Sequence, residues 1–171
     1  EMSASLVGSE MCIRDRLKDV GIEVDASIVG DGDKVEDMKN LIKKLNLDGS
    51  VNYIGALGHD NLPNYYKKLD LFIFPSEKCE SLGLVGLEAM ASSIPVIGSN
   101  IGGIKTYIID AFNGYLFPPK DYMALADCIR KYISLDIEKK NQIRNNAYDT
   151  AREYESSQVI NTLFNKILRH G

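Results

Sequence analysis

Short apolar runs alternate with stretches of helical periodicity from Leu17 onward. The longest run is LDLFIF at residues 69–74, a composition typical of a strand buried on both faces. Residues 34–45 instead place their apolar side chains three or four positions apart, which predicts an amphipathic helix. The pattern as a whole predicts strands at 24–30, 51–54, 69–74, 95–97 and 115–117, and helices at 34–45, 61–68, 83–91, 121–134, 136–154 and 156–169.

This alternation of strand and helix predicts an α/β fold with parallel βαβ units in a Rossmann-like, doubly wound sheet. In such sheets, ligands bind beyond the carboxyl ends of the strands. The loops that follow predicted strands are therefore the places to search for a site. They are residues 30–33, 55–60, 75–83 and 98–104.

Composition narrows the class of protein. The 171 residues fit one domain, and the net charge of −4 argues against a nucleic-acid partner. No apolar run reaches about 18 residues, the length that a membrane-spanning helix needs. The three cysteines are far apart and odd in number, so they indicate neither a disulfide framework nor a metal site. A reducing, cytoplasmic location follows from that cysteine usage.

Residues 1–16, EMSASLVGSEMCIRDR, have neither helical nor strand periodicity. The segment resembles a translated sequencing-adapter tail, and we expect it not to be native. The predicted domain is therefore residues 17–171, with residues 136–171 forming its C-terminal helices.

The segment 75–103, PSEKCESLGLVGLEAMASSIPVIGSNIGG, begins where the strongest predicted strand ends. Its helix should start near Ser81, Leu82, Gly83 and Leu84, whose free backbone N–H groups face outward. Such a helix start favours a phosphate or pyrophosphate, and Gly83 allows a ligand to approach the backbone closely.

Two glutamates flank this helix start. Glu88 lies one to two turns into the helix, where its carboxylate can accept two hydrogen bonds from a ribose diol. Glu80 lies in the loop, where it could bond sugar hydroxyls or stabilise positive charge at an anomeric carbon. Together these groups suit a nucleoside diphosphate sugar. The plainer interpretations are a surface helix carboxylate for Glu88 and a helix cap for Glu80.

The ordered series of motifs resembles the family 4 retaining glycosyltransferases, which have the two-domain GT-B fold. Glu80 and Glu88 match that family's E-x7-E motif. The other matching segments are Pro75-Ser76, Gly83, Glu88-Ala89-Met90, Pro95-Val96, Ile28 to Gly32, Val51 to Gly55, Asp70 to Ser76, Gly102-Gly103 and Asn113-Gly114.

The resemblance implies that Glu88 holds the donor ribose and that Glu80 contacts the transferred sugar. It implies that Ser81, Leu82, Gly83 and Leu84 offer N–H groups to the sugar and diphosphate, while Gly30 and Gly32 form a turn facing an interdomain cleft. It further implies no metal or other cofactor, retention of anomeric configuration without a protein nucleophile, and an acceptor on a glycan or glycolipid. Members commonly work at the inner face of the cytoplasmic membrane, to which the acceptor domain would attach peripherally.

The chain departs from the family pattern in several places. Lys105-Thr106 stands where Pro-Glu is usual, and Ser93 replaces a glycine at the end of a helix. Nothing at residues 1–21 matches the family's Arg and Lys diphosphate clamp, and the N-terminal acceptor domain is not in the sequence. Because transfer requires a positioned acceptor hydroxyl, we expect the 171-residue chain to be inactive by itself.

Two other functions stay open at this point. One is a stand-alone nucleotide-binding module without catalysis. The other is a flavodoxin-like or receiver domain. The acidic loop Gly30–Asp33 argues against a flavodoxin, because its carboxylates would repel phosphate. A receiver domain needs an exposed phospho-acceptor Asp at a strand end, and only Asp31 and Asp70 lie near strands, with Asp70 at the wrong end.

Overall fold

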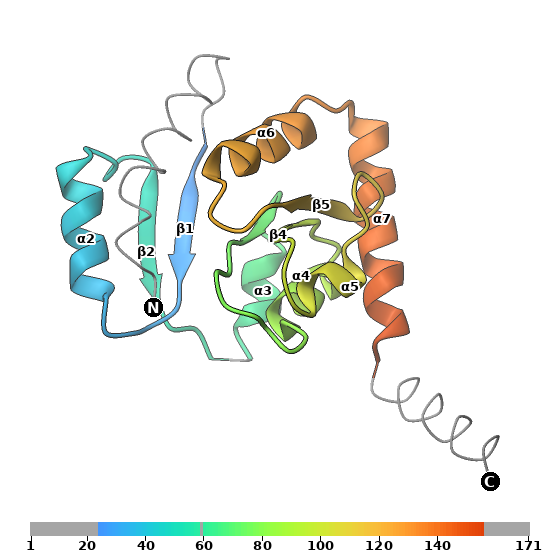
Figure 1. Cartoon of the computed structure of the whole chain (residues 1–171), viewed down its shortest axis with the longest axis horizontal. Coiled ribbons are helices and arrows are strands. Elements are labelled where there is room, and N and C mark those ends of the chain that lie inside the picture. Colours follow the sequence, from blue (N-terminus) through green and yellow to red (C-terminus); the bar gives the residue numbers. More distant parts are fainter. Residues whose placement is uncertain (1–23, 59, 156–171) are drawn as a thin grey trace, which may run out of the picture.

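The computed structural model describes residues 24–58 and 60–155. Strands and helices alternate along these residues, as Figure 1 shows. The elements are β1 (Ala26–Val29), α2 (Val35–Lys44), β2 (Val51–Gly55), α3 (Leu62–Tyr66), β3 (Phe72–Phe74), α4 (Leu84–Ala91), β4 (Val96–Ser99), α5 (Ile104–Tyr107), β5 (Gly114–Phe117), α6 (Tyr122–Ile133) and α7 (Ile137–Glu153).

The predicted order of elements is confirmed from β1 to α7, with ends that differ by a few residues. The short helix α5 is an addition that the sequence pattern did not predict. The helix predicted at 156–169 and the segment 1–16 lie outside the described residues.

All pairings between the named strands are parallel, which confirms the predicted α/β class. The described strands form two sheets, one of order β1-β2 and one of order β3-β4-β5. The first sheet carries α2, whose Met38 and Ile42 pack with Leu47 in a small core. No strand among the described residues joins β1 to β3.

The main core lies on both faces of the β3-β4-β5 sheet. On one face Val96 packs with Met90, Ile104 and Tyr107, from α4 and α5. On the other face Ile97 packs with residues of β5, α6 and α7, among them Phe117, Leu125, Ile129 and Ile143. Figure 1 shows α6 on one side of β5 and α4 with α5 on the other. Helices on both faces are the mark of a doubly wound sheet.

β3 is less buried than its sequence predicts. Phe72, Ile73 and Phe74 are all half-buried, whereas every residue of β4 is buried. The reason is that β4 pairs on both edges, while β3 pairs with β4 alone. This exposure lies at the open edge of β3, because its two faces pack against the two cores, Phe72 and Phe74 on one and Ile73 on the other.

Side-chain caps fix the start of the last two helices. Asp121, the predicted cap of α6, accepts a hydrogen bond from the Ala124 backbone N–H at 2.9 Å. Asp136 accepts one from the Lys139 N–H at 2.7 Å at the start of α7. These caps satisfy N–H groups that a helix leaves without an internal partner.

Candidate functional site

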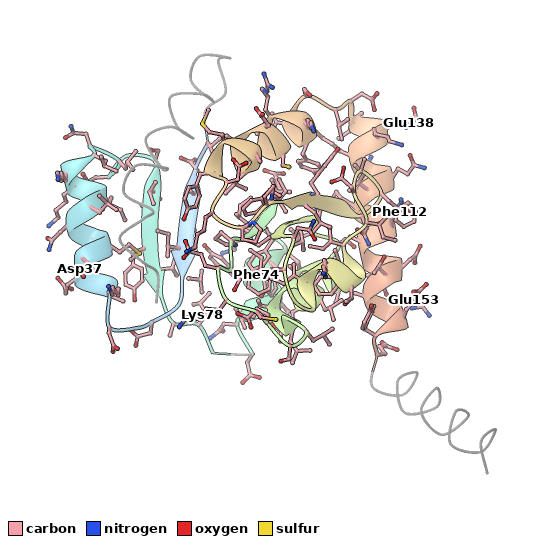
Figure 2. The ribbon with its side chains drawn as sticks, in the orientation of Figure 1. Asp37, Phe74, Lys78, Phe112, Glu138 and Glu153 are labelled. Carbon is pink, nitrogen blue, oxygen red and sulfur yellow. The ribbon has the colours of Figure 1, made fainter. Side chains whose placement is uncertain are left out.

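The candidate site is the loop after β3, residues 75–83, together with the first two turns of α4. Phe74 ends β3 near the centre of Figure 2, and Lys78 lies in the loop below it. The structure brings Glu80, Ser81, Leu82, Gly83, Leu84 and Glu88 together on this single loop and helix, as the sequence predicted.

Gly83 shapes the start of α4. It has the left-handed conformation, with φ 73° and ψ 57°. A Cβ atom there would lie 2.6 Å from the Phe74 ring, so no other residue fits without rearrangement. The adjoining side chains Leu84 and Val85 are 63% and 40% exposed. The first N–H groups of α4 therefore lie at the molecular surface, where an anion could reach them.

Gly102 and Gly103, which precede α5, pack against the backbone of the loop. Gly103 donates its backbone N–H to the Glu80 carbonyl at 2.8 Å. A Cβ on Gly102 would collide with the Glu80 carbonyl oxygen, and one on Gly103 would collide with that of Ser81. The Gly102-Gly103 pair thus lies directly against the loop backbone, which explains why these positions lack side chains.

Tyr107 of α5 is hydrogen-bonded to the end of the loop. Its hydroxyl donates to the Gly83 carbonyl at 3.0 Å, and its side chain is 1% exposed. Burial raises the pKa of Tyr107, so the hydroxyl keeps its proton and remains a donor across the ordinary pH range. A Cβ on Gly86 would collide with this same hydroxyl, so Gly86 lets α4 pack closely on Tyr107.

The Glu80 carboxylate is half-buried and has one defined partner. The Ser76 hydroxyl lies 3.1 Å from Glu80 Oε1 and 3.0 Å from the Lys78 carbonyl, two acceptors between which it can switch. For the plainer interpretation, in which Glu80 caps the helix, the described residues offer no hydrogen bond, since the recorded partner of the carboxylate is the Ser76 hydroxyl. Glu80 is thus a carboxylate at the mouth of the loop, oriented by Ser76.

Glu88 lies half-buried on α4 beside Tyr66 of α3. Burial, together with the charge of Glu88 and a hydrogen bond to it, raises the pKa of Tyr66 to about 12. The Tyr66 hydroxyl also lies 3.5 Å from the Val85 carbonyl. Tyr66 is therefore a core side chain, and the charge of the predicted ribose carboxylate acts on its hydroxyl.

Gly30 and Gly32 lie at the end of β1, in the other sheet. Gly30 has φ 143° and donates its N–H to the Gly55 carbonyl at 3.0 Å. The Tyr53 hydroxyl donates to the Gly30 carbonyl at 2.9 Å. Gly32 donates its N–H to Asp31 Oδ1 at 2.8 Å. The turn is thus tied to the end of β2, and its two carboxylates, Asp31 and Asp33, make it acidic.

A large cavity of about 1600 Å³ lies between the two sheets. Gly30, Pro75 and Val85 line it, whereas Glu80, Glu88 and Ser81 do not. The predicted ligand groups therefore lie on the surface beside the cavity. The candidate site is therefore the loop and the start of α4 rather than the cavity.

Sequence reasoning missed three contacts of this site. Ser76 was recognised as part of a motif, but not as the partner of Glu80. Tyr107 lies in a helix that the pattern did not predict, and Tyr66 was not connected with Glu88. A sequence signal existed for Tyr66, because helical spacing puts one ring of the Tyr65-Tyr66 pair in the core.

The sequence profile of one known family matches residues 14–150, and its description is glycosyl transferases group 1. The chain is 33% identical over 157 residues to N-acetyl-alpha-D-glucosaminyl L-malate synthase of Bacillus anthracis, which covers 86% of this chain and 39% of that protein. It is 34% identical over 160 residues to the sulfoquinovosyl transferase SQD2 of Arabidopsis thaliana, covering 91% of this chain and 28% of that protein. The chain thus spans less than half the length of these relatives.

Solved structures show the same fold. The Anabaena protein HepE in complex with UDP superposes with a TM-score of 0.80 at 27% identity, covering 98% of this chain and 46% of HepE. The C-terminal domain of the glycosyl transferase group 1 family protein LpcC from Francisella tularensis gives a TM-score of 0.70 at 28% identity, covering 88% of this chain and 77% of that domain. These likenesses confirm the predicted fold class, a Rossmann-like half of a GT-B glycosyltransferase.

Proposed function

The chain belongs to the glycosyl transferases group 1 family, and we propose that it is the donor-binding half of a retaining enzyme of that family. The enzyme would move a sugar from a nucleoside diphosphate sugar to an acceptor hydroxyl. One observation carries this proposal: the exposed start of α4 lies between two half-buried carboxylates, Glu80 and Glu88, on a loop supported by Gly102 and Gly103. HepE structures with UDP and with UDP-glucose support the same ligand class.

In this proposal the backbone N–H groups of Ser81 to Leu84 bind the diphosphate. Its negative charge is favoured by the positive end of the α4 dipole, without a metal ion. Glu88 accepts two hydrogen bonds from the ribose diol. The Tyr66 hydroxyl, whose pKa Glu88 helps to raise, would limit the positions that this carboxylate can adopt.

Glu80 acts at the sugar. As the bond from the anomeric carbon to the diphosphate breaks, positive charge develops on the sugar ring, and a carboxylate nearby stabilises it. We propose that the acceptor hydroxyl attacks from the same face as the departing diphosphate and gives its proton to the departing diphosphate oxygen, which retains the anomeric configuration. The Ser76 hydroxyl would keep Glu80 oriented for this role.

The finer assignments rest on the family resemblance alone. They are an acceptor on a glycan or glycolipid, and work in the cytoplasm at the inner face of the membrane. Among the described residues no helix is long and apolar enough to span a bilayer. Gly30 and Gly32 are proposed to face the acceptor half across the interdomain cleft.

The test is calorimetric titration of the 171-residue chain with UDP, UDP-glucose, GDP and ADP. Glu88→Ala should weaken UDP binding by about tenfold, because hydrogen bonds to a charged group contribute roughly 1.5–3 kcal/mol. Glu80→Gln should weaken UDP-glucose more than UDP. The matched control is Glu138→Ala, an exposed carboxylate in the first turn of α7, which should change neither.

Absence of binding by all four nucleotides at millimolar concentration would contradict the donor site. Equal affinity of Glu88→Ala and the unaltered chain would contradict the ribose role. UDP binding by the chain, combined with no transfer by the complete native protein, would favour the stand-alone binding module.

A further inference from the structure

The backbone carbonyl of Gly83, where the loop meets α4, accepts two hydrogen bonds. The Gly86 N–H donates to it at 3.0 Å from the first turn of α4. The Tyr107 hydroxyl donates to it at 3.0 Å from α5. One partner is enough to satisfy a buried carbonyl, so the burial of Gly83 does not by itself require the bond from Tyr107.

The Tyr107 hydroxyl also determines which residue α4 can have beside it. A Cβ at Gly86 would collide with that hydroxyl and would lie 3.1 Å from the ring carbon Cζ that carries it. Glycine in the interior of a helix is less favourable than alanine. A phenylalanine at position 107 would fill the same space without the hydroxyl. The bond to Gly83 is thus kept at the expense of helix propensity, which indicates a role beyond packing.

The peptide that joins Gly83 to Leu84 connects this bond to the surface. The peptide is trans and planar, so its carbonyl and its N–H point in opposite directions. The carbonyl faces Tyr107, whose side chain is buried, and the N–H therefore faces away from the core. This Leu84 N–H has no hydrogen-bond partner within residues 24–58 and 60–155. A carbonyl that accepts two hydrogen bonds also polarises its peptide, which makes the N–H a stronger donor.

Tyr107 is itself fixed at its backbone and at its ring. Its carbonyl accepts a hydrogen bond from Asn113 Nδ2 at 2.8 Å, and Asn113 is fully buried. The same nitrogen lies 2.9 Å from Thr150 Oγ1 on α7. The ring of Tyr154 meets the Tyr107 ring edge-on, with the centroids 6.2 Å apart. The hydroxyl of Tyr107 therefore has a defined position relative to α7, and it imposes that position on the Gly83 peptide.

We propose that Tyr107 is a positioning residue for the diphosphate of the sugar donor. Its hydroxyl holds the Gly83 peptide so that the Leu84 N–H points towards the phosphate oxygens, and Gly86 leaves room for that hydroxyl. This inference rests on the proposed donor site and adds to it a buried side chain that touches neither the nucleotide nor the sugar.

The test is an NMR titration of the 171-residue chain with UDP, in which the Leu84 amide is the reporter. Tyr107→Phe keeps the ring and leaves the Gly83 carbonyl its bond from Gly86, so this variant should fold. It should weaken UDP binding by about fivefold, the effect of one hydrogen bond. It should also reduce the shift of the Leu84 amide proton at saturating UDP. Tyr115→Phe, which alters a buried tyrosine in the core on the other face of the sheet, is the matched control and should change neither quantity.

A second substitution reaches the same bond from the helix. Gly86→Ala should displace the Tyr107 hydroxyl and weaken UDP binding to a similar extent. The double variant Gly86→Ala/Tyr107→Phe should bind UDP as Tyr107→Phe does, because both substitutions remove one interaction. An additional loss of UDP affinity in the double variant would show that the two residues act separately and would overturn the proposal.

The remaining outcomes separate this proposal from the proposed function. A lower UDP affinity together with a smaller Leu84 shift supports the positioning role. An unchanged UDP affinity in Tyr107→Phe overturns it. A lower affinity with an unchanged Leu84 shift at saturation also overturns it, because the effect is then one of stability alone. If the unaltered chain binds no UDP, the donor site itself fails, and the positioning role fails with it.

Discussion

Ser93 is a serine in a backbone conformation that favours glycine. Its φ is 60°, directly after the end of α4, where the Ile94 N–H donates back to the Ala89 carbonyl at 3.0 Å. This is the left-handed turn that commonly ends a helix. The Cβ of Ser93 therefore adds strain that a glycine at this position would not have.

We expect Ser93→Gly to stabilise the fold by about 1 kcal/mol, because glycine adopts this conformation without a steric penalty. The midpoint of thermal unfolding should rise by about 2–4 °C for a chain of this size. Ala91→Gly, inside the last turn of α4, is the matched control and should destabilise by up to about 1 kcal/mol. An unchanged or lower midpoint for Ser93→Gly would refute the argument.

Tyr66 makes stability depend on pH in the alkaline range. Burial and Glu88 raise its pKa from the ordinary value of 10.0 to about 12 in the folded chain. The folded state therefore holds this proton more tightly than the unfolded state, so stability is complete below pH 10 and falls as the pH rises towards 12. Urea unfolding of the chain and of Tyr66→Phe between pH 8 and 12 measures this. The variant should lose less stability over that interval, and parallel curves would contradict the assignment.

Single residues also show what a sequence can reveal. The Ser93 turn was predictable because a helical pattern stops shortly before an Ile-Pro strand. The bond from Tyr107 to Gly83 was not, because it joins residues 24 positions apart through a helix of only four residues. Such a short helix has too little periodicity to detect.

At the scale of elements, the loop after β3 depends on the glycines packed against it. Gly103→Ala should destabilise the chain and abolish UDP binding, because its Cβ would collide with the Ser81 carbonyl, which cannot move without the loop. Gly49→Ala is the matched control, since a Cβ there meets nothing within 4 Å. Thermal unfolding and UDP titration of both variants check this. Equal UDP affinity for Gly103→Ala and the unaltered chain would show that the loop tolerates the shift.

The elements themselves were largely predictable, but their pairing was not. Apolar runs and helical spacing located the strands and the larger helices, because those patterns reflect local geometry. The half-burial of β3 depends instead on what lies at its other edge, which no local pattern in LDLFIF records. The candidate site was predictable because its residues, from Glu80 to Glu88, form one continuous loop and helix whose geometry is local.

At the scale of the whole molecule, the proposed function gives this chain only the donor side of a transfer reaction. It spans 39% of the Bacillus anthracis relative, and its candidate site contains groups suited to a donor. Transfer also requires an acceptor hydroxyl held against the anomeric carbon. We therefore expect this chain to bind the sugar donor without transferring the sugar.

The purified 171-residue chain should bind UDP-glucose without transferring glucose. The check is incubation with radiolabelled UDP-glucose and a membrane lipid and glycan extract, followed by separation of labelled products. The Glu88→Ala variant, run in parallel, identifies any contaminating transferase. Labelled product made by the unaltered chain and lost in that variant would refute the expectation.

The parallel pairing has a consequence for how the chain folds. Ala26 pairs with Val51, Phe72 with Val96, and Val96 with Gly114, so each pairing between strands must first close a loop that contains a helix. No hairpin can form early and act as a template for the next strand. Proteins dominated by such distant contacts fold slowly, and their unpaired strands stay exposed to neighbouring chains meanwhile. Folding rate and losses to aggregation should therefore limit the yield of this chain more than its final stability does.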